Sequence, residues 1–166
     1  MPIPSTSGPY GLLPPGKHPC SMDEIQQVFV LGAPFSSERQ VIFDAFSVWM
    51  DSVRSLFPGA RCWVDGGFVT HKSWAAPTDI DVAFFVRQSD LDALDPSQQA
   101  IFESLQTDKN AAGVRVQPMG GKVDGFVGLR SDPDTTLYWR QFWGQVKGPD
   151  GAQVQNTEKG FLEVIA

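Results

Sequence analysis

Two aspartates separated by one apolar residue are the side chains in this sequence best suited to chemistry. Asp79 and Asp81 lie at the start of an apolar run, 80–86, that predicts a β-strand in the interior of a sheet. Side chains at i and i+2 of a strand share a face, so the Cα atoms of the two aspartates lie about 6.6 Å apart, with Ile80, Val82 and Phe84 on the opposite face. Two unit charges at that separation repel by about 2.5 kcal/mol at an effective dielectric constant near 20. Water, a bound proton or a cation has to offset this repulsion.

A divalent cation fits this pair of carboxylates. Mg²⁺ binds oxygen ligands at about 2.1 Å and is commonly held by one or two carboxylates together with substrate phosphates. Asp79 and Asp81 are therefore candidate catalytic residues and metal ligands, for Mg²⁺ or for Mn²⁺ in its place. The alternative is a solvated strand end that holds two acids and no metal.

A pair of glycines ends the preceding apolar run, 61–65. Glycines let the backbone approach a ligand closely, and the N–H groups of such a turn can bind an anion. The polar loop that follows contains further candidate contacts for phosphate oxygens, and the predicted phosphate-binding set is Gly66, Gly67, Thr70 and Lys72. These residues predict a nucleoside triphosphate laid across a metal ion and the glycine turn. An ordinary tight turn and a solvated lysine are the alternatives.

The composition argues against several other classes of function. The 166 residues include 13 Lys+Arg and 19 Asp+Glu, a net charge of −6, which disfavours an extended nucleic-acid surface. No apolar run approaches the roughly 20 residues of a membrane span, so we expect a cytoplasmic protein without a membrane partner. The glycine-rich run of a P-loop is absent, and two histidines leave little material for a zinc site.

The rest of the sequence predicts one α+β domain with a small mixed sheet. Prolines throughout residues 1–20 exclude a helix and predict an extended N-terminal arm, followed by a single domain over 21–166. Apolar residues at helical spacing predict a long helix over 37–57 that backs the sheet. Further helices are expected over 21–29, over 89–105 with a break near Pro96, and over 135–143, and strands over 61–65, 80–86, 114–117, 123–129 and 160–165.

The glycine pair, a spacer of eleven residues and the Asp79–Asp81 triplet resemble the signature of the nucleotidyltransferase superfamily whose best-known member is DNA polymerase beta. The order of elements agrees: a helix, a strand, the glycine turn and a second strand with the acids. More narrowly, the segments Leu12–His18 and Val64–Thr70 resemble a small family of bacterial and phage proteins with this core.

This resemblance implies a nucleotidyltransferase-like small mixed sheet backed by helices, and Mg²⁺-dependent transfer of a nucleoside monophosphate from a triphosphate to an acceptor. Asp79 and Asp81 match the two metal-binding carboxylates of the superfamily. Active members have a third carboxylate on a later strand. Residues 114–117 contain no acid, and Asp124 is the nearby candidate. The chain also has Phe68 where many small members have an arginine.

The resemblance leaves a second function open, a catalytically inactive copy of the fold that acts through protein contact. Small members of the superfamily include antitoxins and phage- or host-control factors, so a protein partner is the alternative to a nucleotide. The absence of an acid in 114–117, the aromatic segment 138–143 and the proline-rich arm favour this alternative.

The roles of one arginine and of three aromatic residues stay open between binding a ligand and stabilising the fold. Arg115 could reach a triphosphate or pair with one of the many acids. Trp139, Phe142 and Trp143 could stack on a base or belong to a core or an interface.

Overall fold

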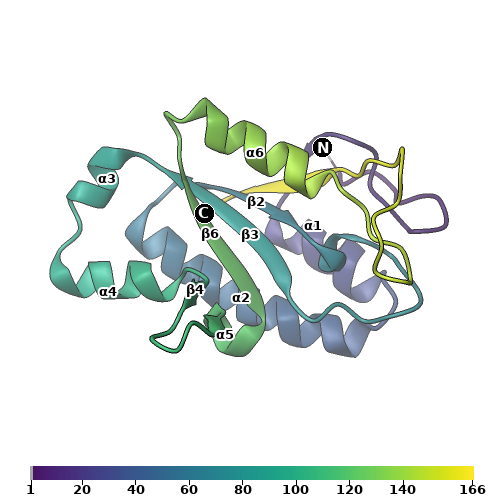
Figure 1. The fold of residues 1–166 in the computed structure, drawn as a ribbon, viewed down its shortest axis with the longest axis horizontal. Coiled ribbons are helices and arrows are strands. Elements are labelled where there is room, and N and C mark those ends of the chain that lie inside the picture. The colour runs from purple at the N-terminus through teal and green to yellow at the C-terminus, as the bar shows by residue number, and fades with distance from the viewer. Residues whose placement is uncertain (1) are drawn as a thin grey trace.

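A computed structural model describes residues 2–166 and shows an α+β fold built on a mixed sheet (Figure 1). The five strands of this sheet lie in the order β1-β7-β2-β3-β6. β2 runs antiparallel to both β3 and β7, whereas β3 with β6 and β1 with β7 are parallel pairs. The predicted α+β class with a small mixed sheet is therefore confirmed. The strands are β1 (Lys17–Pro19), β2 (Arg61–Asp65), β3 (Ile80–Val86), β6 (Val123–Leu129) and β7 (Phe161–Ile165).

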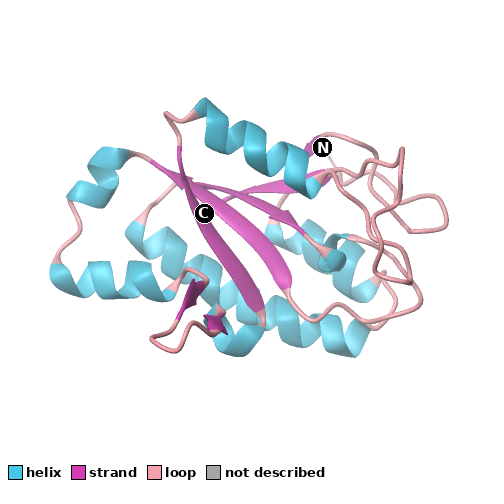
Figure 2. Ribbon diagram, in the orientation of Figure 1, coloured by secondary structure: helices cyan, strands magenta, loops and turns pink. Residues whose placement is uncertain are grey.

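Helices lie on both faces of the sheet, with α6 on one side and α2 and α4 on the other (Figure 2). A small separate ribbon pairs β4 (Asp108–Lys109) with β5 (Arg115–Val116). In the chain, α5 follows this ribbon and leads into β6. The helical elements are α1 (Met22–Gln26), a π-helical turn η1 (Gln27–Leu31), α2 (Ser36–Leu56), a 3₁₀ turn η2 (Gly67–Val69), α3 (Gln88–Asp92), α4 (Pro96–Ser104), α5 (Pro118–Gly121) and α6 (Pro133–Trp143).

Most elements match the predictions from the sequence. β2 and β3 occupy the predicted ranges, and α2 begins and ends within one residue of the predicted helix. The break near Pro96 is confirmed, because Asp95 caps α4 and Pro96 occupies its first turn, where a missing N–H costs nothing. The proline-rich segment contributes β1 to the edge of the sheet, with Pro19 at the strand end, and its Leu13 side chain is buried.

Successive side chains of β3 point to opposite faces of the sheet and so belong to two different hydrophobic cores. Ile80, Val82 and Phe84 pack into the larger core with α2, as predicted. Ala83 and Phe85 face the other way and pack with aromatic residues of α6 in the smaller core. Asp81 shares the face of Ala83 because side chains two apart in a strand point the same way. The acid of β3 therefore lies on the α6 face of the sheet, beyond the end of the aromatic core.

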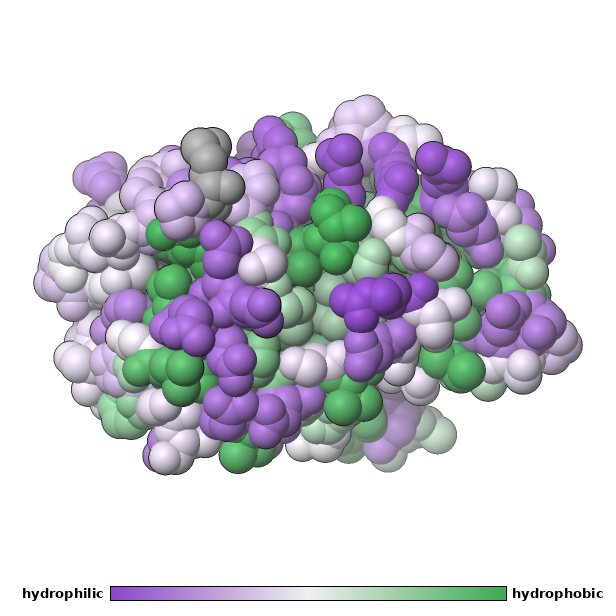
Figure 3. All heavy atoms as spheres, turned by 180° about the vertical axis from the view of Figure 1, so that it is seen from behind, coloured by the Kyte–Doolittle hydropathy of each residue, from purple (hydrophilic) through white to green (hydrophobic). Residues whose placement is uncertain are grey.

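The surface of the molecule is mixed in character. On the face seen in Figure 3, hydrophobic residues form separate groups among hydrophilic ones. None of the helices within residues 2–166 has the length and apolar character that crossing a membrane requires.

Candidate functional site

Three aspartates from three neighbouring strands form one row across the sheet. Asp65 of β2 pairs in register with Asp81 of β3, and Asp81 pairs with Asp124 of β6. Neighbouring strands lie about 4.8 Å apart, and directly paired residues share a face. The three carboxylates therefore gather at one end of the α6 face, and the proposed third acid, Asp124, lies beside Asp81.

The carboxylate of Asp81 is in the least favourable electrostatic position of this row. Burial, followed by the charges of Asp79, Asp65 and Asp124, raises its pKa to about 7. Within residues 2–166, no group donates a hydrogen bond to this carboxylate. A half-buried acid that faces other acids and has no donor is where a cation would stabilise the structure most.

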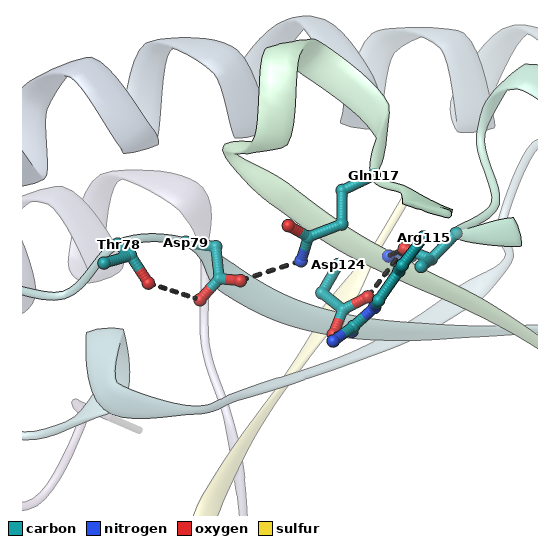
Figure 4. Close-up of polar contacts among 7 residues, drawn as sticks. Thr78, Asp79, Arg115, Gln117 and Asp124 are labelled. Carbon is teal, nitrogen blue, oxygen red and sulfur yellow. Dashed lines mark hydrogen bonds and ion pairs between the residues drawn. The ribbon is translucent and has the colours of Figure 1, made fainter. Parts of the chain in front are cut away.

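Asp79 and Asp124 are contacted instead by residues of the segment that contains β4 and β5 (Figure 4). Asp79 lies one residue before β3, and its Oδ2 accepts a hydrogen bond of 2.8 Å from Nε2 of Gln117. Asp124 accepts a hydrogen bond of 2.6 Å from the Thr107 hydroxyl and forms an ion pair with Arg115. Of the two interpretations of Arg115, the structure thus shows the pairing with an acid.

The donor set has the chemistry that Mg²⁺ requires. Carboxylate oxygens are hard ligands, and one or two of them with phosphate oxygens complete a typical site. Within residues 2–166, no cluster of at least three His, Cys, Asp or Glu side chains is arranged to hold a metal ion by itself. The described residues therefore form no all-protein cage, and a Mg²⁺ ion held by Asp79 and Asp81 would need ligand oxygens to complete its coordination.

The glycine turn packs directly against Asp81. Gly66 has φ 83° and ψ −165°, a backbone conformation that only glycine adopts readily. A Cβ atom at this position would lie 1.8 Å from Oδ2 of Asp81, so no side chain fits there. Gly67 begins η2, and its Cα faces the end of the Lys72 side chain. The missing side chain at Gly66 is therefore required by the Asp81 carboxylate, and the close approach of a ligand to this turn stays a prediction.

A buried arginine holds the far side of the turn. Arg39 of α2 is fully buried and donates hydrogen bonds of 2.6 Å to the carbonyl oxygens of both Phe68 and Thr70. Within the described residues it forms no ion pair, and burial lowers its pKa to about 10. The Thr70 hydroxyl donates to the carbonyl of Gly67 at 2.8 Å, so Thr70 braces the turn from inside.

A cavity of about 240 Å³ opens beside the turn. Lys72 is half-buried in its wall, and burial together with the charges of Arg39 and Lys159 lowers the pKa of its ammonium group. Of the aromatic residues of α6, Trp139 and Trp143 both belong to the smaller core, and Trp143 also lines the cavity. Phe142 lines the cavity as well and is half exposed. The lining includes aromatic residues, lysines and acids together with the turn: Tyr10, Trp74, Phe142, Trp143, Lys72, Lys147, Lys159, Asp65, Asp81, Gly66, Gly67 and Thr70.

The cavity does not include every predicted site residue. Asp79 and Asp124 lie outside its lining, on the side of Asp81 toward β6. The predicted phosphate-binding residues therefore share one cavity with one predicted metal ligand, and the other two acids flank it.

Asp65 and Lys159 are among the residues of the site that were not singled out from the sequence. Nζ of Lys159 lies 2.6 Å from Oδ1 of Asp65 and 3.2 Å from the carbonyl oxygen of Gly66. Burial raises the pKa of Asp65 to about 6, and the contact with Lys159 opposes this rise. Asp65 had a local signal, since it ends a strand directly before the glycines. Lys159 had none, because 94 residues separate it from Asp65.

Comparison with curated proteins and with solved structures finds no match to the chain. Comparison with protein families does find one. Residues 5–165 match a family described as "Family of unknown function (DUF6932)". Because this match spans nearly the whole chain, the protein belongs to the DUF6932 family.

Proposed function

We propose that the protein binds a nucleoside triphosphate with Mg²⁺ at the acidic end of the α6 face and transfers the nucleoside monophosphate to an acceptor. The observation that supports this most strongly is the contact between Gly66 and Asp81. It places a candidate metal ligand and an anion-binding turn side by side in the wall of one cavity.

Each part of the site has a role in this proposal. Asp79 and Asp81 would hold the metal, which when bound neutralises the triphosphate and stabilises the leaving pyrophosphate. The N–H groups of the glycine turn and the ammonium group of Lys72 bind phosphate oxygens. Phe142, which is half exposed and lines the cavity, offers a ring face for a base. Lysines in the wall let a chain of net charge −6 accept a polyanion locally.

The architecture supports the resemblance to the nucleotidyltransferase superfamily. The glycine turn joins β2 to β3, the acid pair begins β3, and a third acid lies on the adjacent strand β6. Asp124 is the candidate third carboxylate in this reading. Its ion pair with Arg115 would have to open before it could act on an acceptor.

Isothermal titration calorimetry with Mg²⁺ or Mn²⁺ and each common nucleoside triphosphate tests the proposal. We expect wild type to bind at least one of them, and Asp79→Asn/Asp81→Asn to weaken that binding about tenfold or more, which corresponds to about 1.4 kcal/mol. A matched control is Asp90→Asn/Asp92→Asn, which neutralises two acids at the same spacing on the exposed α3. No binding of any triphosphate by wild type would exclude the enzymatic function.

The second candidate function, a protein partner, is favoured by one observation. Leu137, Tyr138 and Phe142 of α6 are each at least half exposed, at 55%, 56% and 50%. Large apolar and aromatic side chains are common at binding surfaces. A pull-down from the organism that makes the protein separates the two functions. A partner retained by Asp79→Asn/Asp81→Asn and lost by Leu137→Ser/Tyr138→Ser supports contact, and the reverse result supports the nucleotide site.

A further inference from the structure

Lys159 is a buried cation that reaches the site from the far end of the chain. It lies two residues before β7, and 7% of its side chain is exposed. Its ammonium group donates to the carboxylate of Asp65 and to the carbonyl oxygen of Gly66. One group therefore binds the last residue of β2 and the first residue of the glycine turn.

The backbone around Lys159 is held in place by two other parts of the fold. The N–H of Lys159 donates to the carbonyl of Gly144, at the end of α6, at 3.1 Å. The N–H of Gly160 donates to the carbonyl of Leu13 at 3.2 Å. A Cβ atom on Gly160 would lie 2.1 Å from the carbonyl oxygen of Pro14, so the N-terminal segment closes tightly over this point. Lys159 is thus anchored to α6 and to the N-terminal segment while its side chain reaches the turn.

The contacts of Lys159 bear directly on the position of Asp81. Gly66 touches Oδ2 of Asp81, so a shift of the turn toward β3 is blocked by that carboxylate, whereas a shift away is opposed by the bond from Lys159 to the Gly66 carbonyl. The same ammonium group neutralises Asp65, which is the neighbour of Asp81 in the row of acids. Without it, Asp65 would add an uncompensated charge beside Asp81 or take up a proton.

We propose that Lys159 is a positioning residue of the site, which locks the glycine turn against Asp81 and joins the C-terminal segment and the turn into one rigid wall of the cavity. The proposal rests on the proposed function only in the claim that this wall receives phosphates. Its structural part, the rigidity of the turn, can be measured without any ligand.

The test compares wild type with Asp65→Asn/Lys159→Met, which removes both charges and keeps similar volumes. Replacing a buried ion pair in this way often leaves stability unchanged, so we expect a folded protein. NMR order parameters of the Gly66 and Gly67 amides should fall from about 0.85 in wild type to below about 0.6 in the variant. The affinity for a Mn²⁺–triphosphate complex should fall about tenfold or more.

Two further variants distinguish positioning from a general loss of structure. Lys159→Arg retains the charge and can bind both acceptors, so it should restore the order parameters and bring the affinity to within about threefold of wild type. Lys17→Met breaks a second lysine–carboxylate pair of the sheet, Lys17 with Glu163, and should change neither measurement at the turn.

The results separate the two proposals. Unchanged order parameters at the glycine turn in Asp65→Asn/Lys159→Met would overturn the role of Lys159, whatever the nucleotide does. If wild type binds no triphosphate but the turn still loosens, the proposed function fails and the positioning role stands. If the double variant does not fold, Lys159→Met compared with wild type at pH 5 decides, because the bond to the Gly66 carbonyl is lost and Asp65 is neutral at that pH. A measurable loosening of the turn supports the proposal, and wild-type order parameters contradict it.

Discussion

Gly66 combines a backbone conformation and a contact that no other residue can satisfy together. Its φ of 83° places it in a region that side chains avoid, and Oδ2 of Asp81 occupies the space of a Cβ atom. Gly67 lacks both constraints, since a Cβ atom at this position would lie 3.0 Å from Nζ of Lys72, the end of a flexible side chain. The two adjacent glycines therefore have different physical roles in the same turn.

This difference gives a first prediction. Gly66→Ala should lower the free energy of unfolding by about 1–3 kcal/mol, because it adds backbone strain and displaces a carboxylate. Gly67→Ala is the matched control and should cost less than about 1 kcal/mol. Urea unfolding of both variants measures the effect. Equal losses would contradict the contact between Gly66 and Asp81.

Asp81 gives a second prediction, about pH. Its pKa is raised from 3.8 to about 7 in the folded protein, so between these values the folded state binds a proton that the unfolded chain releases. Its contribution to stability is therefore complete below about pH 4 and is lost as pH rises through about 7. Asp81→Asn should be more stable than wild type at pH 8, by an amount on the order of 3 kcal/mol after allowance for partial solvent screening.

The measurement is urea unfolding in EDTA at pH 5 and pH 8. The advantage of Asp81→Asn should be much smaller at pH 5, where wild-type Asp81 is largely protonated. Asp92→Asn, at an exposed acid of α3, serves as the control. An Asp81→Asn variant that is less stable than wild type at pH 8 would show that this carboxylate is not under electrostatic stress.

At the scale of elements, the segment that contains β4 and β5 provides hydrogen-bond and ion-pair partners for two of the acids. Arg115 and Gln117 come from one short stretch and contact Asp124 and Asp79 (Figure 4). The Arg115 side chain is 57% exposed, whereas that of Asp124 is 6% exposed. An exposed arginine is thus paired with a buried acid, and a metal ion at Asp124 would have to compete with it.

A third prediction follows from this competition. Arg115→Ala should tighten the binding of Mn²⁺ about threefold, because it removes a positive charge that occupies Asp124. Arg54→Ala breaks an exposed ion pair with Asp51 on α2 and should leave the affinity unchanged. Titration calorimetry in the absence of nucleotide measures both. Weaker binding by Arg115→Ala would show that the arginine supports the site and does not compete with a metal.

The elements themselves were largely predictable, because local patterns determine them. The apolar runs of β2 and β3, the helical spacing of α2 and the cap at Asp95 each depend on residues close together in the chain. The pairing of β1 with β7 was not predictable, since it joins residues 17–19 to residues 161–163. Prolines exclude a helix in that segment but give no signal of which strand it will pair with.

At the scale of the whole molecule, the site depends on contacts between distant segments. Lys159 reaches Asp65, Arg39 of α2 reaches the carbonyls of Phe68 and Thr70, and Arg115 reaches Asp124. Spacing in the sequence indicated the glycines and the acid pair, which lie within 16 residues of each other. The cations that hold or neutralise these groups depend on tertiary packing, which no local pattern specifies.

The central claim, that the acid pair and the glycine turn together bind a metal–triphosphate complex, is tested most directly by paramagnetic NMR. Mn²⁺ broadens amide signals near its binding site, so it can be added with a non-hydrolysable triphosphate analogue and the broadening mapped along the chain. We predict broadening centred on Gly66, Gly67, Asp79 and Asp81, extending to Asp124 across the β3–β6 pair. Broadening centred on exposed acids such as Asp90 and Asp92 of α3, with none at the glycine turn, would contradict the claim.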